Sequence, residues 1–168
     1  MKLFKNIKKW LENQEHLFYL FLFILIVPNI VLCFTEPLSF IAKVCNVLLP
    51  FGCYYLLMTL SRNCGTLLWI FLLFLFFGAF QIVLLYLFGQ SIIAVDMFLN
   101  LVTTNSSEAM ELLGNLTPAI VVVVILYIPA LVLATISIVR KRMLSAAFIR
   151  RERKRAFVVF GVSLLSLA

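Results

Sequence analysis

The sequence predicts an all-α protein, a polytopic integral membrane helical bundle with four complete spans, a truncated fifth span, and amphipathic helices in an outer loop. Of its 168 residues, 64% are hydrophobic, and the mean hydropathy of +1.14 is far outside the range of a soluble domain. The apolar residues come in runs close to the length of about 20 residues that a helix needs to cross a hydrocarbon core. The bases gather between alternate runs, which is typical of a chain that crosses a membrane several times.

Four apolar runs reach or approach the length of a membrane span, and a fifth begins like them. The four cover residues 17–34, 40–60, 67–88 and 116–139, and the fifth covers 156–168. Because the fifth has only 13 residues, we expect a truncated span and a chain that is a fragment of a longer protein. Pro28, Pro50 and Pro129 fall inside runs, where membrane helices tolerate proline, and we expect kinks there.

The distribution of bases predicts the orientation of the chain. The N-terminal segment 1–10 holds four lysines, Arg62 follows the second run, and residues 140–155 hold eight bases against Glu152. The connections 35–39 and 89–115 hold none. Because loops on the inner side collect Lys and Arg, we expect the N-terminus inside and residues 89–115 outside.

Few side chains suggest metal or catalytic chemistry. The four cysteines form no Cys-x-x-Cys pair and His16 is the only histidine, so this chain supplies neither a histidine-based metal site nor a Ser/His triad. The bases that give the net charge of +7 lie beside apolar segments without interleaved aromatic residues, which argues against nucleic acid as a partner. Lys43 and Asn46 are costly in lipid, and we place Lys43 at the outer interface.

A ladder of polar residues runs through the outer loop 89–115. Asp96, Asn100, Thr104 and Glu108 recur at intervals of four, and Glu111 follows three residues later. On a helix, such positions lie along one face, and the residues between them are mostly apolar. The segment therefore predicts one or two amphipathic helices at the outer membrane surface, the second of them capped by serines 106 and 107.

An anionic face at this depth is matched to a zwitterionic lipid headgroup. A carboxylate can pair with an ammonium group, while asparagine and threonine can donate hydrogen bonds to a phosphate. An amphipathic loop that is merely solvated would show the same spacing. The residues by themselves leave both interpretations open.

Together these features resemble the amino-terminal membrane domain of the lipid A phosphoethanolamine transferases. These are inner-membrane enzymes of Gram-negative bacteria and include the mobile colistin-resistance proteins. Their outer loop carries Asn, then Thr four residues later, then Glu four residues after that, and "DMFLNLVTTNSSEAMELL" matches this pattern at Asn100, Thr104 and Glu108. The likeness in architecture covers residues 1–168 as one transmembrane domain, whereas the likeness in residues is concentrated in 94–113.

The resemblance implies a location and an activity. The protein would lie in a bacterial inner membrane, with a cytoplasmic N-terminus and a periplasmic loop 89–115. The family moves phosphoethanolamine from phosphatidylethanolamine to lipid A, which confers polymyxin resistance. Asn100, Thr104 and Glu108 would hold the donor headgroup, with Glu108 beside its amine.

The family's chemistry resides in another part of the protein. It passes through a covalent intermediate on a threonine beside zinc, in a domain of the sulfatase or alkaline-phosphatase type that follows the fifth span. We therefore expect zinc and the catalytic residues only after residue 168. Within the chain itself we expect no catalytic residue and no metal ligand.

Two alternatives remain open from the sequence. Another five-span phosphotransferase of the sulfatase-like superfamily, acting on glycans or lipoteichoic acid, would share the topology, although a glycerol-phosphate donor would give Glu108 no charge partner. A non-enzymatic small membrane protein, such as an interaction subunit or half of a transporter, is the other. Transporters often hold ionisable residues at mid-membrane, and the spans contain none apart from Lys43 and its polar neighbour Asn46.

Overall fold

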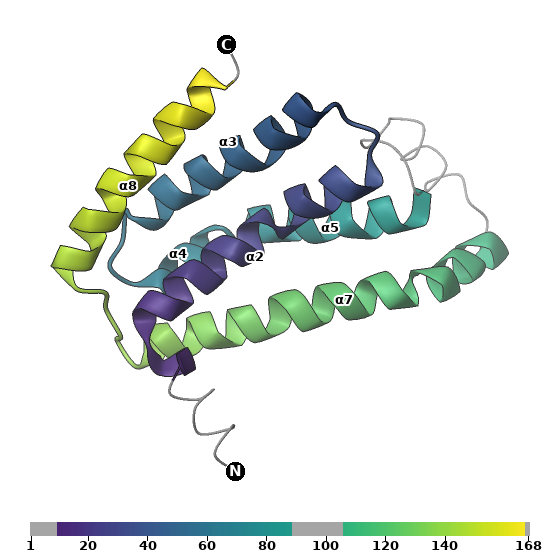
Figure 1. The fold of residues 1–168 in the computed structure, drawn as a ribbon. Coiled ribbons are helices and arrows are strands. Elements are labelled where there is room, and N and C mark those ends of the chain that lie inside the picture. Colours follow the sequence, from purple (N-terminus) through teal and green to yellow (C-terminus); the bar gives the residue numbers. More distant parts are fainter. Residues whose placement is uncertain (1–9, 89–105, 167–168) are drawn as a thin grey trace.

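The computed structural model describes the backbone of residues 10–88 and 106–166, and the side chains of 10–83 and 117–166. This part of the chain is helical and contains no strand. Its helices, shown in Figure 1, are α2 (Gln14–Thr35), α3 (Phe40–Met58), α4 (Cys64–Ile70), α5 (Leu72–Phe88), α7 (Ser106–Val139) and α8 (Ala146–Leu165). The all-α prediction is confirmed for these residues.

Three helices are long and apolar enough to cross a membrane: α2, α3 and the part Thr117–Val139 of α7. The pair α4 and α5 meets the same test only when its two helices are counted as one span, and these two are bent by 62°. The chain is therefore consistent with a multi-pass membrane protein. The first and second predicted runs coincide with α2 and α3 to within a few residues, and the fourth coincides with the part Thr117–Val139 of α7.

The third predicted run, 67–88, does not form one straight helix. It breaks at Phe71, whose φ of −84° and ψ of 11° lie between helical and extended values, so α4 and α5 leave it in different directions. Neither proline nor glycine stands at this position. Phe71 is buried in the core beside Tyr54 and Phe74, so tertiary packing accompanies the break.

Three prolines lie inside continuous helices. Pro28 lies within α2, Pro50 within α3 and Pro129 within α7, and each of these helices continues through its proline without being divided. The helix break at Phe71 lies at a position that carries no proline, and the kinks expected at the three prolines stay a prediction.

The helices form a bundle in which α2 is central. In Figure 1, α3 lies between α2 and α8, and α7 lies on the other side of α2. α4 and α5 both pack against α7. We call the end at which α2 and α8 begin and α3 and α7 end the basic end. The opposite end, where α3 and α7 begin, is the far end.

Of the basic segment 140–155, residues 146–155 form the first half of a helix. α8 begins at Ala146, where the hydroxyl of Ser145 accepts a hydrogen bond from the Phe148 amide at 3.1 Å, and it continues unbroken into the apolar fifth run. α8 runs antiparallel to α3: Tyr55 contacts Glu152 and Cys45 contacts Ser166. The bases of α8 therefore lie next to the last turn of α3.

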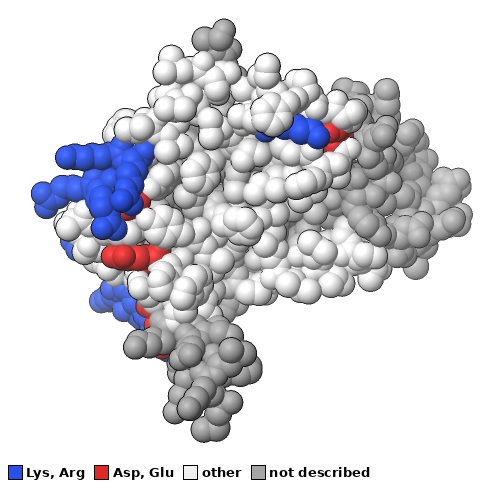
Figure 2. Space-filling view, in the orientation of Figure 1, with Lys and Arg blue, Asp and Glu red and all other residues white. Residues whose placement is uncertain are grey.

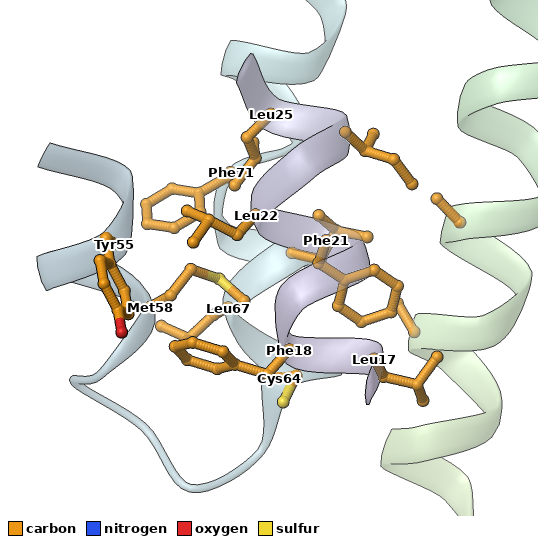
Figure 3. Packing of buried hydrophobic residues seen from close by; sticks show 14 of the residues in the cluster. Leu17, Phe18, Phe21, Leu22, Leu25, Tyr55, Met58, Cys64, Leu67 and Phe71 are labelled. Atoms are coloured by element: carbon orange, nitrogen blue, oxygen red, sulfur yellow. The ribbon is translucent and has the colours of Figure 1, made fainter. Parts of the chain in front are cut away.

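The core is built around the first half of α2. Figure 3 shows Phe18, Phe21 and Leu22 of α2 surrounded by side chains of the neighbouring helices, among them Met58 and Leu67. Phe18 and Phe21 are fully buried, whereas many apolar residues on the outer faces of α5 and α7 are exposed, as expected of helices that face lipid.

Two asparagine side chains pair with each other between α2 and α3. The Asn46 side chain of α3 donates a hydrogen bond to the Asn29 carbonyl oxygen of α2 at 2.9 Å, and the Asn29 amide donates to the Asn46 side-chain oxygen at 3.2 Å. Asn46 therefore faces protein. Lys43 lines a shallow apolar groove with Phe34 near the far end, and its predicted place at a membrane interface stays a prediction.

At Gly65, α4 closely approaches the backbone of α7. A methyl group on Gly65 would lie 2.2 Å from the backbone oxygen of Ala134 in α7. One turn away, the Trp69 indole donates a hydrogen bond to the Thr135 hydroxyl at 3.2 Å. Inside a lipid environment, contacts at small residues replace the hydrophobic effect as the force between helices.

We predict that Gly65→Ala lowers the free energy of unfolding by about 1–3 kcal/mol, because the backbone of Ala134 cannot move aside as a side chain would. Thermal unfolding of the purified protein in detergent measures the loss. Gly161→Ala is the matched control, since a methyl group there meets no atom within 4 Å. Equal stability of the two variants would contradict the assigned contact between α4 and α7.

Candidate functional site

The predicted headgroup site lies mostly outside the described residues. Asn100 and Thr104 fall in the segment 89–105, which is not described, and Glu108 lies in the first turn of α7 with its side chain undescribed. Their proposed roles stay predictions. What the structure adds is the backbone that carries position 108.

α7 is longer than a span requires. Its 34 residues extend for about 51 Å, whereas a hydrocarbon core is about 30 Å thick. The apolar part is Thr117–Val139, so residues 106–116 precede the span on the same helix at the far end. Positions 108 and 111 are three apart and share one face of this helix. The predicted separate amphipathic helix is thus, from Ser106 onward, continuous with the span.

The best-defined polar cluster lies at the basic end and centres on Glu152. This residue is on α8, and its side chain is fully buried against α3. The Tyr55 hydroxyl of α3 donates a hydrogen bond to Oε2 of Glu152 at 2.5 Å. Arg151 Nε and Arg155 Nη1 donate to the other oxygen, Oε1, at 2.9 and 3.0 Å.

The surroundings of Glu152 hold its carboxyl group in the ionised form. Burial by itself would raise the pKa of Glu152, because it disfavours the charged state. The hydrogen bonds from Tyr55 and Arg151 and the charge of Arg155 outweigh burial, and the pKa is lowered overall. The ionised carboxylate of Glu152 therefore links α8 to α3 through its hydrogen bond with Tyr55. We call this contact the Glu152 joint.

Other bases at this end hold backbone groups. Arg153 Nη2 donates to the carbonyl oxygen of Thr59 at 2.7 Å, which gives a partner to an acceptor at the end of α3. The side chain of Arg62 donates to the Leu144 carbonyl at 3.0 Å, and the Leu144 amide donates to the Arg62 carbonyl at 2.7 Å. The connections α3–α4 and α7–α8 are thereby tied together.

The N-terminal end of α2 joins the same network. Arg142 Nη1 donates to the Glu12 carbonyl oxygen at 3.2 Å, and the Glu12 carboxylate lies 3.9 Å from both Arg140 and Arg142. The Ser137 hydroxyl donates to the Gln14 side-chain oxygen at 2.7 Å, which links α7 to α2. These pairs are partly exposed, so their individual contribution to stability is small.

The polar contacts around Glu152 at the basic end hold helices together. Both oxygens of Glu152 are occupied by donors, which leaves it neither a free base nor a ligand. Among the described residues there is no group of three His, Cys, Asp or Glu side chains that could hold a metal ion. From the sequence, these bases indicate only the orientation of the chain, and the contacts of Glu152 were not predicted, although this single acid among five bases was a visible cue.

Comparison with known proteins gives no family: no family model matches the chain, and no curated protein and no solved structure matches it.

We predict that acid weakens the protein through Glu152. Because its folded pKa lies below the unfolded value of about 4.3, its contribution is fully present above that value and is lost as the pH falls through the folded pKa. Thermal unfolding from about pH 7 to about pH 3 measures this decline. The Glu152→Gln variant starts from lower stability, and its stability should fall less steeply as the pH is lowered. A decline as steep as that of the unmodified protein would contradict the role given to Glu152.

Removal of the tyrosine donor tests the same joint at neutral pH. Tyr55→Phe leaves Oε2 of the buried carboxylate without its protein donor, and we expect a loss of about 1.5–3 kcal/mol in the free energy of unfolding. Tyr54→Phe, at the neighbouring position on α3, is the control, since Tyr54 packs by its ring against Phe71 and Phe74. A larger loss of unfolding free energy in Tyr54→Phe than in Tyr55→Phe would contradict the stabilising role given to the Tyr55–Glu152 hydrogen bond.

Proposed function

We propose that this chain is the membrane domain of a lipid A phosphoethanolamine transferase, and that its outer loop holds the headgroup of the donor phosphatidylethanolamine. The observation that carries the proposal is the motif at 94–113, in which Asn100, Thr104 and Glu108 recur at intervals of four between the third and fourth apolar segments. In this proposal the protein lies in a bacterial inner membrane, with residues 89–115 in the periplasm and lipid A as the acceptor.

The charge distribution of the described part supports this orientation. Figure 2 shows the Lys and Arg side chains gathered at the basic end, over the start of α8 and the connection from α7. Of the described bases, Lys43 alone belongs to the far half of the bundle. Because inner-side loops collect bases, the basic end is assigned to the cytoplasm and the far end to the periplasm.

The geometry of α7 supports the position of the loop. Glu108 and Glu111 lie on the part of the helix that precedes the span, so their backbone is beyond the apolar stretch on the far side. A carboxylate at that depth can pair with the ammonium of an ethanolamine headgroup, and Asn100 and Thr104 can donate hydrogen bonds to its phosphate. Acids in a first helical turn are also favoured by the helix dipole.

The role of this domain in the reaction would be positioning. A donor lipid held at a fixed depth and orientation reaches the reacting group with less loss of entropy, which contributes substantially to rate. In the proposal, zinc and the nucleophilic threonine belong to a catalytic domain encoded after residue 168. Zinc would activate the threonine and stabilise the charge that develops on the phosphate oxygens.

The test uses the protein encoded by the complete reading frame, expressed in a Gram-negative host. We expect lipid A to gain the mass of one phosphoethanolamine group by mass spectrometry. Glu108→Gln should reduce this modification about 10- to 100-fold, since it removes a charge-assisted contact to the amine. The matched control is Glu111→Gln, which removes the same charge one turn away and should retain most of the activity.

Other outcomes separate the alternatives. Modification of a glycan with unmodified lipid A would indicate a different phosphotransferase of the superfamily. A reading frame that encodes no phosphatase-like domain would favour a non-enzymatic membrane protein. Equal activity of Glu108→Gln and the unmodified protein would overturn the role given to the loop.

A further inference from the structure

The outer face of α8 carries an open groove at the basic end of the molecule. Its volume is about 510 Å³, and it is lined by four bases and one aromatic residue, namely Arg150, Arg151, Arg153, Lys154 and Phe157. Figure 2 shows this dense cluster of bases at the end of the molecule where α8 begins. The orientation rule requires only that bases be present in this segment, and it does not require a groove.

The bases of the groove differ in what they bind. Arg151 pairs with the buried Glu152 carboxylate, and Arg153 donates to the Thr59 carbonyl oxygen. Arg150 and Lys154 are exposed and have no hydrogen-bond or ion-pair partner within the part of the chain that the structure describes. Since they are four residues apart on one helix, both side chains project from the same face.

The single acid of this segment is turned away from the groove. The Glu152 side chain is fully buried against α3, and it is shared between Arg151 and Arg155. Residues 150–155 thus contain five bases and one acid, and the charge of this acid is already paired. The groove is left with an uncompensated positive charge on its open side.

The depth of the groove is fixed by the contacts of α8 with α3. Glu152 is level with Tyr55, one turn before α3 ends at Met58. Immediately beyond the bases, α8 becomes apolar, and Phe157 is 58% exposed three residues after Lys154. The groove therefore lies where an apolar helix surface gives way to a charged one, which is the depth of lipid phosphates.

We propose that this groove is a binding site for the phosphate of an anionic glycerophospholipid, with Arg150 and Lys154 as its principal ligands and Phe157 beside the first part of the acyl chains. Guanidinium and ammonium groups bind phosphate oxygens through charge-assisted hydrogen bonds. Basic pockets beside membrane helices attract anionic headgroups in this way. The apolar border formed by Phe157 favours a lipid over a free phosphate or a nucleic acid.

This site is independent of the proposed transferase function. It lies at the opposite end of the bundle from the outer loop, and it would act on the lipid of the other leaflet. The contact would hold α8 at a fixed depth, and through the Glu152 joint it would hold α3 as well.

The test measures lipid binding by the purified chain in detergent micelles, using native mass spectrometry. Phosphatidylglycerol is titrated against phosphatidylcholine of the same acyl chains, and we expect the anionic lipid to bind more tightly. The double variant Arg150→Gln, Lys154→Gln should weaken phosphatidylglycerol binding about 25-fold, at about 5-fold for each base near the headgroup. Because neither side chain holds another part of the chain, circular dichroism should show unchanged helix content.

Two further variants control for charge and shape. Arg140→Gln with Lys141→Gln removes the same charge from exposed positions outside the groove and should leave binding unchanged. The exchange Arg150→Lys with Lys154→Arg keeps the charge and should retain binding. Equal loss in the two neutralised variants, equal affinity for both lipids, or displacement of the lipid by inorganic phosphate would overturn the proposal. So would a single-stranded RNA that binds in place of the lipid.

Discussion

The structure depends on a constraint that acts on every apolar helix placed in lipid. Helices that are apolar on all sides gain nothing from the hydrophobic effect when they touch one another, so their association requires close packing and paired polar groups. Both are found here. Gly65 allows α4 to approach the backbone of α7, and the Asn29 and Asn46 side chains satisfy each other between α2 and α3.

The strongest polar contacts are concentrated at one end. There, Glu152 joins α8 to α3, Arg153 holds the end of α3, and Arg62 ties two connections together. The bases from which the sequence predicts the orientation therefore also have a structural use. Their side chains supply donors to carbonyl groups at helix ends that have no partner within the helix.

The two ends of the bundle differ in chemistry. The basic end is held by charged contacts and offers a groove with unpaired bases, whereas the far end leads to the first turn of α7, which carries the acidic position Glu108. A protein with such an asymmetry can interact with anionic lipid on one side and with an ammonium headgroup on the other. The proposed functions use opposite ends and opposite charges, so each can be tested without the other.

The sequence by itself determined that the chain is helical, that it has several apolar segments able to cross a membrane, and where most of these lie. These properties follow from composition and run length, because the transfer of a residue into lipid depends mainly on its own side chain. The candidate headgroup site also comes from the sequence alone. Only the backbone of Glu108 is described, so the site stays a prediction.

Only the tertiary structure decided that the run 67–88 breaks at Phe71, that the basic segment is the start of α8, and that Glu152 meets Tyr55 from 97 residues away. None of these has a local signal strong enough to predict it, since Phe71 is neither proline nor glycine and Glu152 stands among bases. Each depends on which helices become neighbours. A contact energy belongs to a pair of residues, and the pairing is fixed by the packing of the bundle as a whole.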